Sequence, residues 1–301
     1  MLSGMLLIFA ALIVGYLIPI SKKSTLDLII KSTSRLVYVI LALMGLSLSA
    51  VDNLSENLQL ISKYTAVFFL VIGACNLICL PLVDRFYGIQ ADSKQSKLPL
   101  LSMAIESAKL VLVIAAGLVV GLFFPVNVHI VETTSQWILL LLLLLIGIQL
   151  RNSGLTLRQI ILNKHGMLIA AVIVASSLIG GVIAAKILGI SVIKGLAMSS
   201  GFGWYSLSGI LIGGAYGPIW GGASFLIELL RELLSLILIP LIIGTRPLTA
   251  IGYAGATALD FTLPVIQTTG GVRCVPIAIV SGFILTLLNP VLMLFFISLA
   301  S

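Results

Sequence analysis

The chain has 301 residues, of which 60% are hydrophobic and only 9% are charged, and its formal net charge is +7. A soluble domain carries roughly a quarter of charged residues, so a chain with this little charge could not cover its surface in water. The composition excludes the ordinary soluble classes and predicts a protein whose solvent is the lipid bilayer.

Long apolar runs recur along the whole sequence. A helix needs about 20 apolar residues to cross the hydrocarbon core of a bilayer. Eight stretches are of this kind: Leu2–Ile20, Leu36–Val51, Tyr64–Val83, Leu110–Pro125, Trp137–Leu150, Met167–Leu188, Ile219–Ile243 and Val275–Leu299. Charges lie between the runs, and the short alternating segments of a membrane β-barrel are missing from the sequence. The pattern predicts an all-α integral membrane protein.

The first run, Leu2–Ile20, resembles a signal peptide only superficially. It is too long for a signal h-region, no basic residue precedes it, and no small-residue cleavage site follows it. We expect a retained first helix.

Lysine and arginine gather in alternate loops, and cytoplasmic loops are the ones enriched in these residues. The basic loops follow the first, third and fifth predicted helices. Their basic residues are Lys22, Lys23, Lys31 and Arg35; Arg85, Lys94, Lys97 and Lys109; and Arg151, Arg158 and Lys164. We expect these loops in the cytoplasm and the N-terminus outside. The positive charge therefore indicates orientation, and no nucleic acid partner is expected.

Two three-helix units resemble each other. Gly15–Pro19 (GYLIP) recurs as Gly121–Pro125 (GLFFP), and Leu43–Leu48 (LMGLSL) recurs as Leu145–Leu150 (LIGIQL). Each unit has an odd number of spans and the polar linker 84–106 does not cross, so the second unit is predicted to be inverted. Inverted repeats are typical of secondary transporters. The expected parts are 1–106, the first repeat with its linker, 107–194, the inverted repeat, and 195–301, a transport core.

The predicted core contains two stretches rich in glycine, serine and threonine, each followed by a long apolar helix. They are Gly201–Gly209 (GFGWYSLSG) and Gly255–Pro264 (GATALDFTLP). Irregular backbone is tolerated at membrane depth only where protein or water covers it. We interpret both as re-entrant or broken helices, near 196–216 and 248–271, beside eight full spans with both termini outside. The alternative is two complete glycine-rich spans, which makes ten.

Four acids lie in or at the end of apolar stretches. An ionisable group in a span costs roughly 2.5–3.5 kcal/mol on insertion scales and is a functional candidate by default. The four are Asp52, Glu228, Glu232 and Asp260. Structural alternatives are a helix-end position for Asp52, a self-neutralising cluster for the two glutamates and a capping role for Asp260.

Glu228, Arg231 and Glu232 fall on one side of a predicted helix, because residues three and four apart are neighbours there. One arginine neutralises only one acid. We predict that Glu228 pairs with Arg231 and that Glu232 is the coupling carboxylate, although the spacing leaves the choice between the two glutamates open. A further polar residue in a run, Asn76, is predicted to make an interhelical hydrogen bond.

Common enzyme signatures are missing from the sequence, which contains no HExxH, GxSxG or GxxxxGK[ST]. Its two histidines and three cysteines do not form a ligand cluster. We therefore expect a transporter with no cofactor and no metal.

Several motifs closely resemble the LysO lysine exporter family of bacterial inner membranes, over essentially the whole chain. They are Gly203–Gly209, Leu230–Leu233 (LREL), Gly255–Pro264, Gly270–Gly271, Gly147–Asn152 (GIQLRN) and Met44–Leu48 (MGLSL). The resemblance implies a multi-pass inner-membrane protein that exports L-lysine and its analogue thialysine, coupled to proton entry. It also implies that acids at Asp52 and Glu232 are needed.

The energy needed to move a cation out of the cell also indicates that export is coupled to an ion gradient. An inside-negative potential retains a cation by about 2.3 kcal/mol per 100 mV, so a lysine exporter has to be driven. A carboxylate that binds either a proton or an ammonium group provides exchange, with a proton-to-lysine ratio that the sequence leaves open. The expected partners are L-lysine, protons and the bilayer, with a homodimer as an open alternative to a monomer. Other open classes are a sodium-coupled transporter of another small organic solute and a membrane scaffold or channel.

The stretch Gly203–Gly209 is the predicted substrate site. Its backbone N–H groups, at the N-terminus of a broken helix, suit a carboxylate. Further side chains are predicted to contribute donors, to pack on the aliphatic stem or to bind the ammonium group. They are Ser206, Ser208, Trp204 and Tyr205, with Asp260 and Thr262 facing them from the second break and Glu232 reaching in from the next helix. The structural alternative is that the small residues only allow close helix packing.

Overall fold

The computed structural model describes residues 10–11, 13–20, 22–50, 54–87, 89, 91, 100–124, 127–152 and 163–300. Within these ranges the chain forms α-helices, two 3₁₀ turns and loops, without any strand. The prediction of an all-α protein is therefore confirmed.

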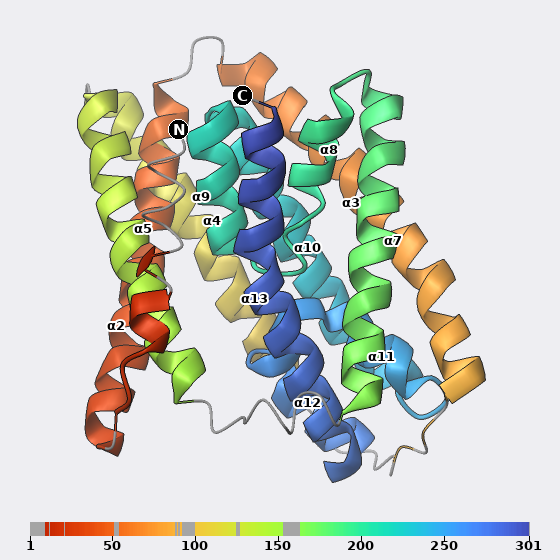
Figure 1. Ribbon diagram of the computed structural model, residues 1–301. Helices are drawn as coiled ribbons and strands as arrows, with labels where there is room; N and C mark the ends of the chain where they lie inside the picture. Colours follow the sequence, from red (N-terminus) through yellow and green to blue (C-terminus); the bar gives the residue numbers. More distant parts are fainter. Residues whose placement is uncertain are drawn as a thin grey trace. The chain divides into compact units, whose positions relative to one another are not determined.

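Seven long helices coincide with seven of the eight predicted apolar runs (Figure 1). They are α2 (Lys23–Ser49), α3 (Leu54–Tyr87), α4 (Leu100–Phe123), α5 (Val128–Arg151), α7 (Lys164–Leu188), α10 (Pro218–Ile242) and α13 (Val275–Leu299). The eighth run, Leu2–Ile20, lies partly outside the described residues.

The helix α2 differs from its prediction because it begins at Lys23, within the segment expected to be a basic loop. Lysine and arginine favour helices, and their long side chains can keep a charged head in water while the stem packs on apolar surface. Its 27 residues measure about 40 Å at 1.5 Å per residue, more than the hydrocarbon core requires. The first turns, with Lys31 and Arg35, are thus helical extensions rather than a loop.

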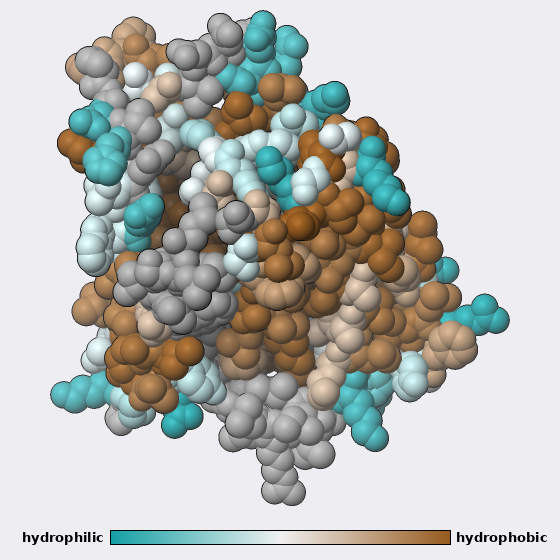
Figure 2. Space-filling model, turned by 45° about the horizontal axis from the view of Figure 1, so that its top comes forward, coloured by the Kyte–Doolittle hydropathy of each residue, from teal (hydrophilic) through white to brown (hydrophobic). Residues whose placement is uncertain are grey.

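In the part of the chain that the structure describes, five helices are long and apolar enough to cross a membrane by length and composition. They cover Ser24–Ser49, Glu56–Tyr87, His129–Gln149, Lys164–Leu188 and Val272–Leu299. Figure 2 shows a broad apolar face with hydrophilic residues toward its edges. On α3, Leu70 and Ile78 are 64% and 70% exposed, as lipid-facing side chains would be. The number of complete spans remains a prediction.

The last third of the chain contains the short helices. They are α8 (Val192–Met198), α9 (Tyr205–Tyr216), α11 (Pro247–Ala254) and α12 (Leu263–Gly270), with 3₁₀ turns at Gly255–Leu259 and Val272–Cys274. Even α9, with 12 residues, is only about 18 Å long, too short to cross the core alone. The α-helical structure is interrupted at 199–204 and at 255–262, and each interruption falls in one of the two glycine-rich stretches. We call these the first break and the second break.

The chain forms two compact units. One comprises 1–61, 108–156 and 209–222, and the other comprises 62–107, 157–208 and 223–301. The chain passes from one unit to the other inside α3, α4, α9 and α10. The predicted division of the chain at residues 106 and 194 is based on sequence repeats and not on compact units. It therefore stays a prediction.

Reciprocal glycine contacts inside the first unit join helices of the two expected repeats, whose inversion stays a prediction. A Cβ atom on Gly15 would collide with the backbone of α5 at Leu144, and one on Gly121, its counterpart in the second repeat, would collide with Ser49 of α2. The first helix of each repeat thus packs against the second helix of the other. This exchange of partners is what a pseudo-two-fold axis between two repeats produces.

The second unit fixes the start of α11 through Asp84, near the end of α3. The Asp84 carboxylate accepts hydrogen bonds from the backbone N–H groups of Leu248 (2.9 Å) and Thr249 (2.7 Å) and from the Thr249 hydroxyl (2.5 Å). These N–H groups have no partner within the helix, and a carboxylate suits the positive end of a helix dipole. Asp84 therefore anchors the segment that leads into the second break. No pattern in the sequence indicates this role of Asp84, because its partners are more than 160 residues away.

Candidate functional site

Three charged side chains are buried together in α10. Glu228, Arg231 and Glu232 are 2%, 4% and 1% exposed. Buried charges are costly unless hydrogen bonds and opposite charges compensate them. Their position in the middle of a 25-residue apolar helix therefore needs a specific set of partners.

The partner of Glu228 is the first break. Its Oε2 atom accepts a hydrogen bond of 2.5 Å from the backbone N–H of Gly203, two residues before α9 begins. A negative charge at the N-terminal end of a helix is favoured by the helix dipole.

The partner of Arg231 is the segment before the second break. Its Nε atom donates a hydrogen bond of 3.1 Å to the carbonyl of Tyr253, in the last turn of α11, and its guanidinium carbon lies 5.9 Å from the centre of the Tyr253 ring. The last carbonyls of a helix lack partners within the helix, and they favour a cation. The two opposite charges of α10 therefore hold two different breaks, each at the helix end that suits its sign.

The two breaks also contact each other directly. The backbone N–H of Ala256 donates a hydrogen bond of 2.7 Å to the carbonyl of Phe202. From α13, the Asn289 side chain donates to the carbonyl of Gly201. The two glycine-rich stretches therefore meet in the backbone, and their role as the substrate site stays a prediction.

Gly255 lies in the contact between the two breaks, at a position that tolerates no side chain. Its φ of 68° and ψ of −135° fall in a region that is essentially restricted to glycine. A Cβ atom there would collide with the carbonyl of Phe202 and would lie 2.9 Å from Nη2 of Arg231.

We expect Gly255→Ala to impair folding or export, because it forces the two breaks apart. The matched control is Gly189→Ala, at the C-cap of α7, where φ is 66° but nothing lies within 4 Å of the added Cβ. The control carries only the left-handed backbone penalty of about 1–2 kcal/mol. Thermal unfolding of the purified variants and transport per inserted protein would compare them. Equal losses in both variants would contradict the proposed role of the contact.

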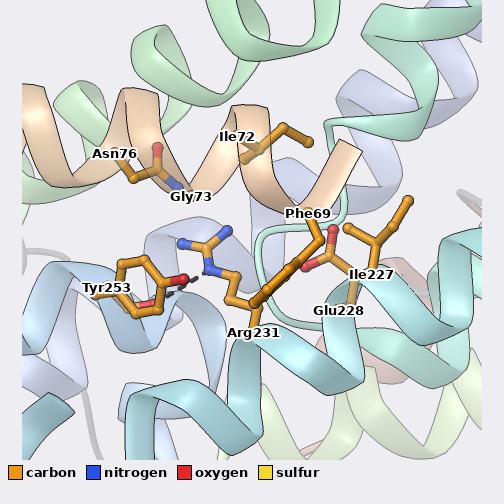
Figure 3. Close-up of a pocket in the computed structure, with 8 residues that line it drawn as sticks. All are labelled: Phe69, Ile72, Gly73, Asn76, Ile227, Glu228, Arg231 and Tyr253. Atoms are coloured by element: carbon orange, nitrogen blue, oxygen red, sulfur yellow. Dashed lines mark hydrogen bonds between the residues drawn. The ribbon is translucent and has the colours of Figure 1, made fainter. Parts of the chain in front are cut away.

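A small cavity lies beside the α10 charges, inside the second unit (Figure 3). Its walls are Phe69, Ile72, Gly73 and Asn76 of α3, Ile227, Glu228 and Arg231 of α10, and Tyr253 of α11. The space accommodates about one water molecule. Free lysine does not fit, so this conformation is closed around the α10 charges.

Asn76 makes the predicted interhelical hydrogen bonds. Its Oδ1 atom accepts from the hydroxyls of Ser176 (2.6 Å) and Ser177 (3.2 Å) on α7. Asn76 also lines the cavity, a role that its position in an apolar run did not reveal.

The side chains predicted at the first break are engaged in different ways. The Ser208 hydroxyl donates to the carbonyl of Trp204 (2.8 Å), and the Tyr205 ring packs edge-on against Phe225 at 5.6 Å. Ser206 is buried, and Trp204 is half-buried. The N–H of Gly203, predicted as a donor to the substrate, is occupied here by the protein's own Glu228 carboxylate.

The other predicted residues lie in three settings. Asp260 is exposed, and its carboxylate accepts from the backbone N–H of Phe261 (2.6 Å), the kind of contact that the capping interpretation expects. The Thr262 hydroxyl is buried and makes no hydrogen bond. Glu232 is buried and interacts with another group of the protein. Asp52 lies outside the described residues.

Comparisons with known proteins extend over nearly the whole chain. The family model described as "Lysine exporter LysO" matches residues 111–297. "Lysine exporter LysO" of Escherichia coli strain K12 is 49% identical over 297 residues, which is 98% of this chain and 99% of the relative. "Putative lysine exporter" of Haemophilus influenzae is 46% identical over 180 residues, 60% of this chain and 92% of the relative.

No solved structure matches the chain. Its apolar helices and these bacterial relatives identify a multi-pass protein of the inner membrane. The family match and the near full-length relative together show that the chain belongs to the LysO lysine exporter family.

Proposed function

We propose that the protein exports L-lysine from the cell in exchange for protons. The main structural observation behind the proposal is the buried Glu228–Arg231–Glu232 cluster of α10, which holds two helix breaks together. Broken helices and buried acids at membrane depth are typical of substrate and ion pathways in transporters. The proposed lysine specificity rests on the similarity to these two relatives, which are named as lysine exporters.

Proton coupling follows from the charge of the substrate. Lysine is a cation at neutral pH, and the membrane potential retains it by about 2.3 kcal/mol per 100 mV. A carboxylate that accepts a proton from outside after releasing an ammonium group makes export depend on proton entry. Glu232 and Asp52 are proposed for this exchange, with Glu228 and Arg231 ordering the breaks around them. Thialysine has the same charged groups and is proposed as a second substrate.

Flux measurements test this proposal. Proteoliposomes loaded with labelled L-lysine are expected to release it when an inward proton gradient is imposed, and an uncoupler is expected to abolish the gradient-driven part. Release that depends on sodium instead would favour the sodium-coupled alternative. If the protein is correctly inserted in the liposomes and releases no lysine under any gradient, lysine export is rejected.

The eight-span topology is proposed because each helix flanking the breaks is too short to cross the core by itself. With two re-entrant segments, Arg246 between α10 and α11 faces the cytoplasm. With ten spans it faces the outside. We expect a single cysteine placed at Arg246 to react with a membrane-impermeant maleimide only after the membrane is opened. Reaction in intact cells would establish the ten-span alternative.

A further inference from the structure

Two buried hydrogen-bond donors face the cavity between α3, α10 and α11 without an acceptor. They are Nδ2 of Asn76 and Nη2 of Arg231. Asn76 is 0% exposed and Arg231 is 4% exposed. In Figure 3 the amide of Asn76 is directed toward the guanidinium of Arg231. Two donors that face one shared space require an acceptor between them, because a buried donor without an acceptor destabilises the fold.

Helix α7 sets the orientation of the Asn76 amide from the side opposite the cavity. The Ser177 hydroxyl donates to Oδ1 (3.2 Å), which places the NH₂ group on the cavity side. The Ser176 hydroxyl lies 2.6 Å from Oδ1, but its one hydrogen is shared with the carbonyl of Val172 (2.7 Å). Helix α7 therefore fixes the donor in place.

Arg231 is held in a similar manner. Its Nε donates to the carbonyl of Tyr253, which leaves Nη2 toward the cavity. An arginine side chain cannot lose its charge in a protein, so the acceptor that suits it best is an anionic oxygen. Planar carboxylates fit a guanidinium group through two parallel hydrogen bonds.

Glu228 completes the arrangement from the same helix. Its carboxylate lines the cavity one turn from Arg231. A cavity with a fixed cation, a neutral donor and a carboxylate is complementary to the head group of a free amino acid, which has a carboxylate beside an ammonium group.

We propose that this cavity binds the α-carboxylate of the exported amino acid, through Asn76 and Arg231. The inference rests on the proposed function and deepens it, since it names the part of the substrate that is recognised here. It also replaces the first break as the carboxylate site, because the Gly203 N–H is already bound by Glu228.

The cavity is closed in this conformation and opens when α3 and α10 separate. Gly73 keeps the space available, because a Cβ atom there would lie 3.2 Å from the Tyr253 hydroxyl oxygen. Binding of the carboxylate satisfies the two donors and thereby offsets the cost of the separation.

Binding of labelled L-lysine to the purified full-length protein in nanodiscs tests the inference. The competitors are unlabelled lysine, L-lysinamide, whose carboxyl group is neutral, and cadaverine, which has none. Wild-type protein is expected to prefer lysine over both by about tenfold or more, the range for a hydrogen bond to a charged group.

The decisive variant is Asn76→Asp, which keeps the acceptor for the two serines and replaces the donor by a negative charge. It is expected to weaken lysine binding by about 10- to 100-fold, while competition by lysinamide and cadaverine stays the same or improves. Asn76→Leu removes the donor without adding a charge and should give a smaller change in the same direction. The control is Thr65→Val, a buried α3 position whose hydroxyl contacts the carbonyl of Ala223 at 3.5 Å. It should not alter the preference.

Three outcomes separate the possibilities. Wild-type protein that binds no lysine would reject the proposed function, and this inference with it. Lysine binding with equal competition by all three compounds would reject the inference alone. Equal weakening of all three by Asn76→Asp would also reject it, since that result indicates a structural residue beside a buried water.

Discussion

Lysine export is expected to stop when Glu232 is replaced by Gln or Asp52 by Asn. Each change keeps the shape of the side chain and removes the carboxylate charge that we propose binds a proton and an ammonium group in turn. Glu232 lies buried in α10. We expect a loss of about 100-fold or more in the initial rate, because a charged hydrogen-bond partner contributes about 1.5–3 kcal/mol and the coupling step is lost as well.

Efflux of labelled lysine from proteoliposomes, per inserted protein, measures this effect. Lysine–lysine exchange should fail too, because the same carboxylate would bind the ammonium group. The control is Ser235→Ala, one turn along α10, whose hydroxyl donates only to the backbone carbonyl of Glu232 (2.7 Å). It should export near the wild-type rate. If either acid variant exports normally, that acid has a structural role.

The helices were predictable because lipid makes hydrophobicity their main signal. Apolar runs identified α7, α10 and α13 within a few residues, since nothing but a helix satisfies the backbone in a bilayer. The start of α2 was not predictable in this way. Lys31 and Arg35 interrupt the run, and hydrophobicity does not distinguish a polar helix extension from a loop.

The breaks were predictable from composition, but their connections were not. Glycine, serine and threonine indicated that helix would be interrupted near 201–209 and 255–264. Which groups meet there depends on pairs far apart in the sequence, such as Gly203 with Glu228 and Phe202 with Ala256. Sequence patterns show donors and acids separately, so the acceptor at Gly203 was expected to be the substrate rather than Glu228.

The Glu228–Arg231–Glu232 cluster was likewise predictable only in part. Its spacing predicted three charges on one side of α10, and all three are buried. The spacing did not show that Glu228 and Arg231 each hold a different helix end, because that depends on where α9 begins and α11 ends.

The charge balance of this cluster leads to the second large effect. Arg231→Met removes the only positive charge of the α10 cluster and leaves two buried carboxylates, a change that costs about 3–5 kcal/mol when one partner of a buried pair is removed. Methionine is unbranched and apolar, so packing is largely preserved. We expect a large drop in the thermal unfolding midpoint. Glu228→Gln alone should reduce stability and export only partly, because the glutamine oxygen can still accept from Gly203.

The double variant Glu228→Gln, Arg231→Met distinguishes charge from geometry. It leaves one buried carboxylate instead of two, so it should unfold at a higher temperature than Arg231→Met alone. Contacting residues show such non-additivity, of about 0.5–3 kcal/mol, whereas distant ones do not. Arg246→Met, at an exposed position after α10, should combine additively with Glu228→Gln. Export should remain low in the double variant, because the guanidinium that holds Tyr253 before the second break is gone. Strict additivity of the Glu228 and Arg231 effects would show that the two charges act independently, and the cluster would then be two separate helix-end contacts.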